Sequence, residues 1–122
     1  MIKNILLICF AILTLGCSTN TPKYAKISSS EKIKIYYIHR EGCPACIYMD
    51  NILSTQEIKS IIDSRFTLID VDINAQEILP KSTMITGTTP TFYYLNSKNQ
   101  EVAEPNHTLE LDRFKQKLNS IR

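Results

Sequence analysis

The sequence predicts an α/β domain in which a central mixed four-stranded sheet is flanked by helices. Strand-like and helix-like runs alternate in the order β-α-β-α-β-β-α, and a Cys-Pro-Ala-Cys motif, Cys43–Cys46, stands at the first junction from strand to helix. The chain has 122 residues, 43% hydrophobic and 21% charged, which fits one small globular domain. A formal net charge of +2 without a basic patch interleaved with aromatic residues argues against a nucleic-acid partner.

The first half of the domain reads as a strand followed by two helices. Ile33–His39 is an apolar run that predicts a buried strand. Pro44 to about Leu53 predicts a helix, because proline is tolerated in the first turn, where its missing N–H is not needed. Ser54–Glu57 has the pattern of a capping box, which predicts the start of a second helix or of a kinked continuation of the first. The apolar face of that helix would be formed by Ile58, Ile61 and Ile62.

The second half supplies the remaining strands and the last helix. Phe66–Asp72 predicts the second strand, and Ala75 to about Thr83 a short helix. A polar turn lies between two strand-like runs, Thr91–Leu95 and Gln100–Ala103, and this pattern predicts a hairpin. Strands joined by helical crossovers should pair in parallel and the hairpin antiparallel. Thr108 is expected to cap a last helix, whose apolar face comprises Leu111, Phe114, Leu118 and Ile121.

The N-terminal residues predict export and a lipid anchor. Residues 1–16 combine a short positive region with the apolar run Ile5–Leu13, too short to span a bilayer comfortably. The run ends in Leu-Thr-Leu-Gly-Cys, which resembles a bacterial lipobox and assigns lipidation to Cys17. We therefore expect a signal peptide at 1–16, a lipidated tether at 17–30 and a folded domain at 31–122. The alternatives are an ordinary secretory signal and an uncleaved anchor.

The two cysteines of the motif are suited to dithiol–disulfide exchange. Cys9 would leave with the signal and Cys17 would be lipidated, so Cys43 and Cys46 remain. At a helix N-terminus the macrodipole favours a thiolate on the first sulfur, and the second lies close enough to attack a mixed disulfide. An inert buried pair or half of a zinc site is the alternative. Zinc normally needs four ligands, or three and water, so we expect neither a metal nor a cofactor.

The element order, the dithiol at the first strand-to-helix junction and Thr89-Pro90 before the third strand together resemble the thioredoxin-like superfamily. The resemblance covers Glu31–Arg122 and is greatest for small exported members, including SoxW-like and periplasmic thioredoxins. It implies a thioredoxin-like fold in which Pro90 is cis and lies against the dithiol. It also implies that Thr89 and Pro90 bind an extended substrate segment.

Some positions depart from the superfamily pattern. Tyr37 stands where many cytoplasmic thioredoxins carry a buried aspartate, and Gly42 where a tryptophan is common. The proton acceptor for the second cysteine is then missing, or is replaced by Glu41 or water. Arg40 is interpreted as a solvated strand end. His39 could either lie at such an end or approach the first cysteine.

These observations predict an exported, membrane-anchored thiol–disulfide oxidoreductase. Cys43 would be the nucleophile and Cys46 the resolving residue, with electrons flowing in the reducing direction. The partners would be thiol or disulfide client proteins, a membrane or periplasmic redox partner and the membrane itself through Cys17. The protein would be a monomer in the cell envelope, facing the periplasm from the outer or inner membrane. The alternatives are a thioredoxin-fold peptide-binding module and a metallochaperone or cytochrome-maturation factor.

Overall fold

The computed structural model describes residues 23–75, 79–83 and 87–122, which contain four strands and three helices. The bounds of the first three strands and of the first helix agree with those predicted from the sequence. In chain order the elements are β1 (Ile33–His39), α1 (Pro44–Leu53), α2 (Gln56–Arg65), β2 (Phe66–Asp72), β3 (Thr91–Leu95), β4 (Glu101–Asn106) and α3 (Leu111–Ser120).

The strands form one mixed sheet in the order β2-β1-β3-β4. β1 pairs in parallel with β2 and antiparallel with β3, so that Tyr36 lies between Ile69 and Tyr93. β3 and β4 form the antiparallel hairpin, with irregular register along it. The predicted mixed four-stranded sheet is therefore confirmed, and β1 lies in its interior, with its C-terminal end leading into the cysteine motif.

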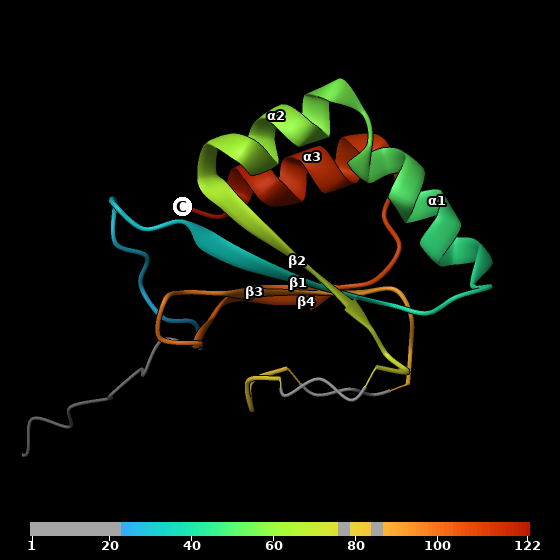
Figure 1. Ribbon diagram of the computed structural model, residues 1–122. Coiled ribbons are helices and arrows are strands. Elements are labelled where there is room, and N and C mark those ends of the chain that lie inside the picture. The colour runs from blue at the N-terminus through green and yellow to red at the C-terminus, as the bar shows by residue number, and fades with distance from the viewer. Residues whose placement is uncertain (1–22, 76–78, 84–86) are drawn as a thin grey trace, which may run out of the picture.

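One face of the sheet is covered by helices (Figure 1). Alternate residues of β1 and β3 point into this layer, where aromatic rings stack. The ring centroids of Tyr37 and Phe92 are 4.7 Å apart, and those of Phe92 and Phe114 are 5.0 Å apart. Full burial of an apolar side chain of this kind stabilises a fold by roughly 1.5–3 kcal/mol. The layer therefore fixes α3 and β1 relative to each other.

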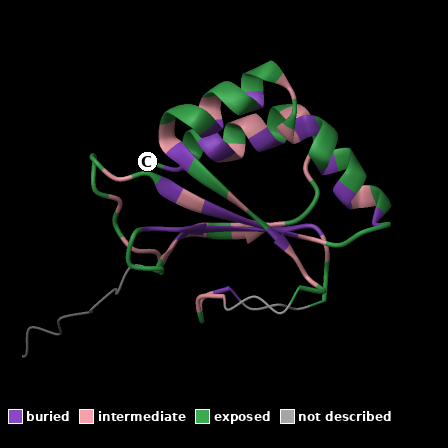
Figure 2. Ribbon diagram, in the orientation of Figure 1, coloured by how far each residue is buried: buried purple, intermediate pink, exposed green. Residues whose placement is uncertain are grey.

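The other face has a smaller apolar cluster and no helix in the described residues. Its buried members are Tyr36, Ile38, Val71, Tyr93 and Leu95. The segment after β2 runs beneath the sheet (Figure 1), and its Ile73 and Leu79 pack against this cluster. Figure 2 shows that buried residues follow the strands and the inner sides of the helices, whereas the outer sides are exposed.

The segment Ala75–Thr83 was predicted as a short helix, and its described part, residues 75 and 79–83, forms bends and turns instead. Both the N–H and the hydroxyl of Thr83 donate to the carbonyl of Pro80, at 2.9 and 2.7 Å. A residue that precedes a proline is biased away from helical backbone angles, which disfavours a helix across Leu79. Residues 76–78 lie outside the described part.

Two helix starts also differ from the predictions. α2 begins after Thr55 as expected, but the Thr55 hydroxyl donates to the carbonyl of Ile52 at 2.7 Å instead of accepting from α2. β4 continues to Asn106, so α3 begins at Leu111, with Glu110 rather than Thr108 at its cap. The capping box and the Thr108 cap were therefore wrong in detail, although the helices exist.

The described end of the predicted tether turns back along the sheet. The N–H of Ala25 donates to the carbonyl of Glu101 at 2.9 Å, and Ala25 and Ile27 pack against the helix-side core. The predicted signal peptide and Cys17 lie outside the described residues. Of the helices that are described, none combines the length and apolar character needed to cross a bilayer.

Candidate functional site: a dithiol at the tip of a helix

The cysteine motif lies where β1 ends and α1 begins. Gly42 has a φ of 75°, in the left-handed region that glycine adopts without a Cβ clash, and this turn redirects the chain into the helix. Cys43 is the N-cap of α1 and Pro44 follows at the first helical position, where its fixed φ suits the helix. The backbone therefore delivers Cys43 to the positive end of the helix dipole.

The sulfur of Cys43 contacts both its own helix and the loop before β3. Cys43 Sγ accepts a hydrogen bond from the Cys46 N–H at 3.2 Å and lies 3.4 Å from Thr89 Oγ1, which can donate to it. The Cys43 thiol can donate to the Thr89 carbonyl at 3.6 Å. The Thr89–Pro90 peptide bond is cis and Pro90 is buried. The expected cis proline loop beside the dithiol is thus confirmed.

Hydrogen bonds give the two sulfurs different acidities. Burial raises the pKa of Cys43, but hydrogen bonds from the Cys46 thiol, the Thr89 hydroxyl, the Cys46 N–H and the Arg40 side chain outweigh it and lower the pKa to about 7. Burial and the hydrogen bond to Cys43 raise the pKa of Cys46. Both are free cysteines and both are 2% exposed. Of the two sulfurs, Cys43 therefore ionises first as the pH rises through about 7, while Cys46 keeps its proton.

A tyrosine and an aspartate lie behind Cys46. The Tyr37 hydroxyl donates to the Cys46 carbonyl at 3.1 Å and to Asp50 Oδ1 at 2.8 Å. Burial and the bond to Asp50 raise the pKa of Tyr37, so this hydroxyl stays protonated. Asp50 was missed by sequence reasoning, although its position one helical turn after Cys46 places both on the same face of α1. Glu41, considered from sequence as the acceptor, is exposed.

Arg40 belongs to the site and His39 does not contact the sulfurs. Arg40 Nε donates to Thr89 Oγ1 at 3.0 Å, so the interpretation of Arg40 as a solvated strand end was wrong. His39 instead pairs with Asp70 at 2.5 Å, across the sheet on β2. Sequence reasoning missed the Arg40 contact because a long side chain reaches a residue 49 positions away in the chain.

A histidine from beyond β4 contacts the proline loop on its other side. His107 Nδ1 lies 3.1 Å from the carbonyl oxygen of Pro90 and 3.2 Å from Thr91 Oγ1. The Thr91 hydroxyl donates to the Thr88 carbonyl at 2.7 Å. These contacts connect the loop before β3 to the chain after β4 and so hold the loop that contains Thr89.

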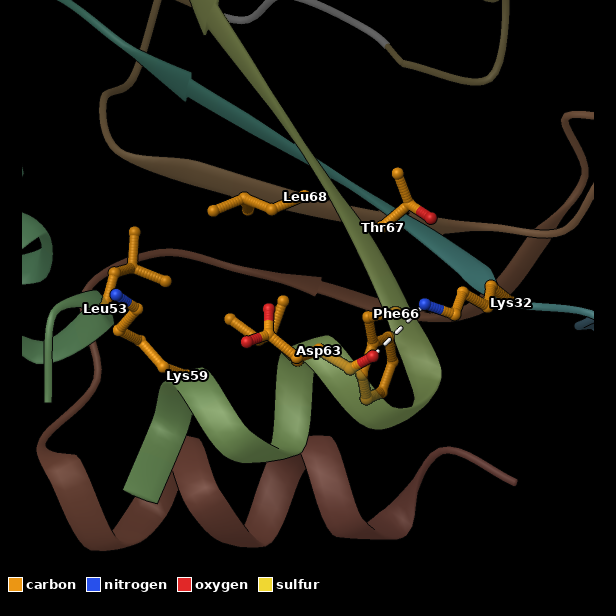
Figure 3. A pocket seen from close by; sticks show the side chains of 8 residues that line it. Lys32, Leu53, Lys59, Asp63, Phe66, Thr67 and Leu68 are labelled. Carbon is orange, nitrogen blue, oxygen red and sulfur yellow. Dashed lines mark hydrogen bonds between the residues drawn. The ribbon is translucent and has the colours of Figure 1, made fainter. Parts of the chain in front are cut away.

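Two hollows of the described structure lie away from the dithiol. One of about 580 Å³ lies between α2 and β2, where Lys32 reaches the Asp63 carbonyl and Leu68 borders the hollow (Figure 3). The other, of about 800 Å³, is lined by residues 27–33 and by the chain ends of α2 and α3. Within the described ranges no three His, Cys, Asp or Glu side chains gather as a metal site would need.

Comparison with known proteins identifies the fold. No protein-family model and no curated protein matches the chain. Among solved structures, a thioredoxin from Thermus thermophilus is 23% identical with a TM-score of 0.61, covering 74% of this chain and 73% of its own. The reduced C-terminal domain of DsbD from Neisseria meningitidis is 22% identical with a TM-score of 0.58, covering 75% and 83%.

A disulphide isomerase from Xylella fastidiosa Temecula1 is also similar, at 14% identity and a TM-score of 0.58, covering 74% of this chain and 78% of its own. All three likenesses extend over most of both chains. At these identities a likeness establishes the fold. The chain has a thioredoxin-like fold.

Proposed function

We propose that this protein is a thiol–disulfide oxidoreductase in which Cys43 is the nucleophile and Cys46 the resolving residue. The observation that carries the proposal is a dithiol at the N-terminus of α1, where Cys43 Sγ accepts from the Cys46 N–H at 3.2 Å and lies 3.4 Å from Thr89 Oγ1. The pKa of Cys43 is lowered to about 7, whereas that of Cys46 is raised. A thiolate is the attacking species in disulfide exchange. Cys43 can therefore attack near neutral pH, whereas Cys46 stays protonated until it resolves the mixed disulfide.

The proposed cycle balances in two exchange steps. The Cys43 thiolate attacks one sulfur of a client disulfide; a mixed disulfide forms and the client's other sulfur leaves as a thiolate. Cys46 then loses its proton and attacks Cys43 Sγ, which releases the client's first sulfur. The client gains two electrons and two protons, and the Cys43–Cys46 pair becomes a disulfide. A partner protein with a dithiol must then reduce it again.

The acidity of Cys43 favours the reducing direction. Stabilising the thiolate stabilises the reduced form of a dithiol, and so makes the pair a stronger oxidant. A pKa of about 7 lies near that of thioredoxin and well above the value of about 3.5 of the strong oxidant DsbA. Moderate stabilisation of Cys43 therefore supports a reductant.

The surface beside the dithiol is suited to an extended client segment. Thr89 and Pro90 form the loop against Cys43, and Ile47 and Tyr48 on α1 are 57% and 44% exposed. We propose that the Thr89 backbone hydrogen bonds the client while these apolar side chains contact it. The protein would act as a monomer anchored by lipid on Cys17 at the periplasmic side of the envelope, in line with the apolar N-terminal run and lipobox-like residues.

Reduction of a model disulfide tests the proposal. The purified protein should accelerate the reduction of insulin by dithiothreitol, and Cys43→Ser should not exceed the rate with dithiothreitol alone. A wild-type protein that adds nothing to that rate would contradict the proposed function.

A further inference from the structure

The hydroxyl of Thr89 lies between a cation and the sulfur of Cys43. Arg40 Nε donates to Thr89 Oγ1 at 3.0 Å, and Thr89 Oγ1 lies 3.4 Å from Cys43 Sγ. Arg40 comes from the loop after β1 and Thr89 from the loop before β3. The guanidinium, the hydroxyl and the sulfur thus form a continuous hydrogen-bonded chain of groups.

We propose that Arg40 is a positioning residue that sets the reactivity of Cys43 through the Thr89 hydroxyl, an inference that rests on the proposed exchange function. A guanidinium only donates hydrogen bonds, so it occupies a lone pair of Thr89 Oγ1 and leaves the hydroxyl proton to point at the sulfur. Its positive charge also polarises the O–H bond, which strengthens the bond that the hydroxyl donates to a thiolate. Arg40 therefore favours the charged form of Cys43.

Two groups of Thr89, its carbonyl and its hydroxyl, can hydrogen-bond Cys43 Sγ. Its carbonyl, 3.6 Å from Cys43 Sγ, accepts from the protonated thiol, and its hydroxyl donates to the thiolate. Loss of the Arg40 contact would free the hydroxyl to rotate away from the sulfur, leaving the carbonyl, which favours the neutral thiol. The balance between the two forms then depends on the guanidinium.

The other groups facing Cys43 do not duplicate this effect. From α1 the sulfur receives the Cys46 thiol and N–H, and the first turn of α1 contains no acidic residue. The loop before β3 contributes the uncharged Thr89. Glu41, in the loop between β1 and α1, is exposed. Burial raises the pKa of Cys43, and hydrogen bonds from Cys46, Thr89 and Arg40 lower it. Arg40 therefore has a direct route to the sulfur beside the route through Thr89, and the double-mutant cycle below separates the two.

The rate of alkylation at Cys43 by iodoacetamide, followed from pH 5 to 10 on the full reduced chain, tests the proposal without any client. Fragmentation of the labelled peptide by mass spectrometry distinguishes Cys43 from the other cysteines. Arg40→Met should lower the rate at about pH 6 by about two- to fivefold, the range expected of an exposed cation, and move the profile to higher pH. An unchanged profile would overturn the proposal.

A double-mutant cycle tests the route through the hydroxyl. Thr89→Val should lower the rate at about pH 6 by roughly tenfold, because it removes a donor to a charged group. Adding Arg40→Met to Thr89→Val should then change the rate little, whereas equal effects of Arg40→Met in both backgrounds would show that Arg40 acts through space. Thr89→Ser keeps the hydroxyl and should retain most of the wild-type rate; a loss as large as with valine would contradict the proposed route.

Matched variants separate this effect from general changes of charge or fold. Arg122→Met removes the same charge from an exposed residue outside the site. It should leave the pH profile of Cys43 alkylation unchanged. If Arg40→Met does not fold, Arg40→Leu, which likewise removes both the charge and the donor, provides the same test. A wild-type protein that fails to reduce insulin while Arg40→Met still shifts the alkylation profile would overturn the proposed function alone.

Discussion

Cys43 lies at the N-terminus of α1 and Cys46 one turn further along the helix. Their side chains are chemically identical, but the pKa of Cys43 is lowered and that of Cys46 is raised. Cys43 and Cys46 are each 2% exposed, so burial alone would raise the pKa of both. Cys43 faces donors from three places: the N–H of its own helix, the Thr89 hydroxyl and the Arg40 side chain. Cys46 instead donates to Cys43, and the nearby Tyr37 hydroxyl is bonded to the Cys46 carbonyl and to Asp50.

The difference shows that hydrogen bonds outweigh burial at Cys43, whereas burial prevails at Cys46, and this contrast assigns the roles in the dithiol. The tip of a helix exposes N–H groups that lack partners in the helix, whereas residues one turn further in have satisfied backbone groups. A loop from a distant part of the chain then supplies the remaining donor. The predictions below test whether the two positions are as different as this comparison requires.

The largest effect is expected from Cys43→Ser. A serine hydroxyl does not ionise near neutral pH, so the variant should lose disulfide reduction down to the rate of the uncatalysed reaction, measured with insulin and dithiothreitol. A double Cys43→Ser, Cys46→Ser variant that keeps its cellular role would instead favour a peptide-binding module.

Cys46→Ser should separate the two steps of the cycle. The Cys43 thiolate can still attack, but no resolving thiol remains, so mixed disulfides with client proteins should accumulate and be visible on non-reducing gels. The matched Cys43→Ser variant should accumulate none. Equal trapping by both variants would contradict the assignment of nucleophile and resolving residue.

Tyr37→Phe should lower the free energy of unfolding by removing the hydroxyl that bonds the Cys46 carbonyl. The variant keeps the ring that stacks on Phe92 but loses the donor to the Cys46 carbonyl and Asp50. We expect a loss of about 1–2 kcal/mol in the free energy of unfolding, measured with urea. Tyr48→Phe removes a hydroxyl from a residue that is 44% exposed and should leave stability unchanged.

The last predicted effect is a pH dependence of stability in the reduced protein. The folded pKa of Cys43, about 7, lies below its ordinary value of 9.0, so the unfolded chain binds more protons between these values. The free energy of unfolding should therefore rise with pH from about 7 to 9, relative to Cys43→Ser, and the gain should be lost as pH falls through 7. A constant difference between the two proteins across this range would contradict the lowered pKa.

Much of the fold could be predicted because its strands are marked by local pattern. The runs Ile33–His39 and Phe66–Asp72 are apolar and bounded by polar segments, and their bounds agree with β1 and β2. Ala75–Thr83 was less predictable because its apolar residues have neighbours on the sheet: Leu79 packs against the face opposite the helices. A helical spacing of apolar residues in so short a segment does not distinguish a helix from a packed loop.

The site residues also differ in how far the sequence predicts them. Cys43 and Cys46 are identifiable from their spacing, and Thr89 and Pro90 from the resemblance to the thioredoxin-like superfamily. Arg40 was not identifiable, because its role depends on a side-chain conformation that brings it to Thr89 across the tertiary structure. Asp50 is connected to the Cys46 backbone only through Tyr37 on β1, whose hydroxyl bonds both Asp50 and the Cys46 carbonyl.

The reduction potential of the Cys43–Cys46 pair tests the central claim most directly. Equilibration of the purified protein with glutathione or dithiothreitol buffers, followed by alkylation and mass spectrometry at the two cysteines, gives the value. A reductant with moderate stabilisation of Cys43 should have a potential near about −270 mV, as thioredoxin does. A value near about −120 mV, or the failure of the pair to form a disulfide in any of these buffers, would contradict the account.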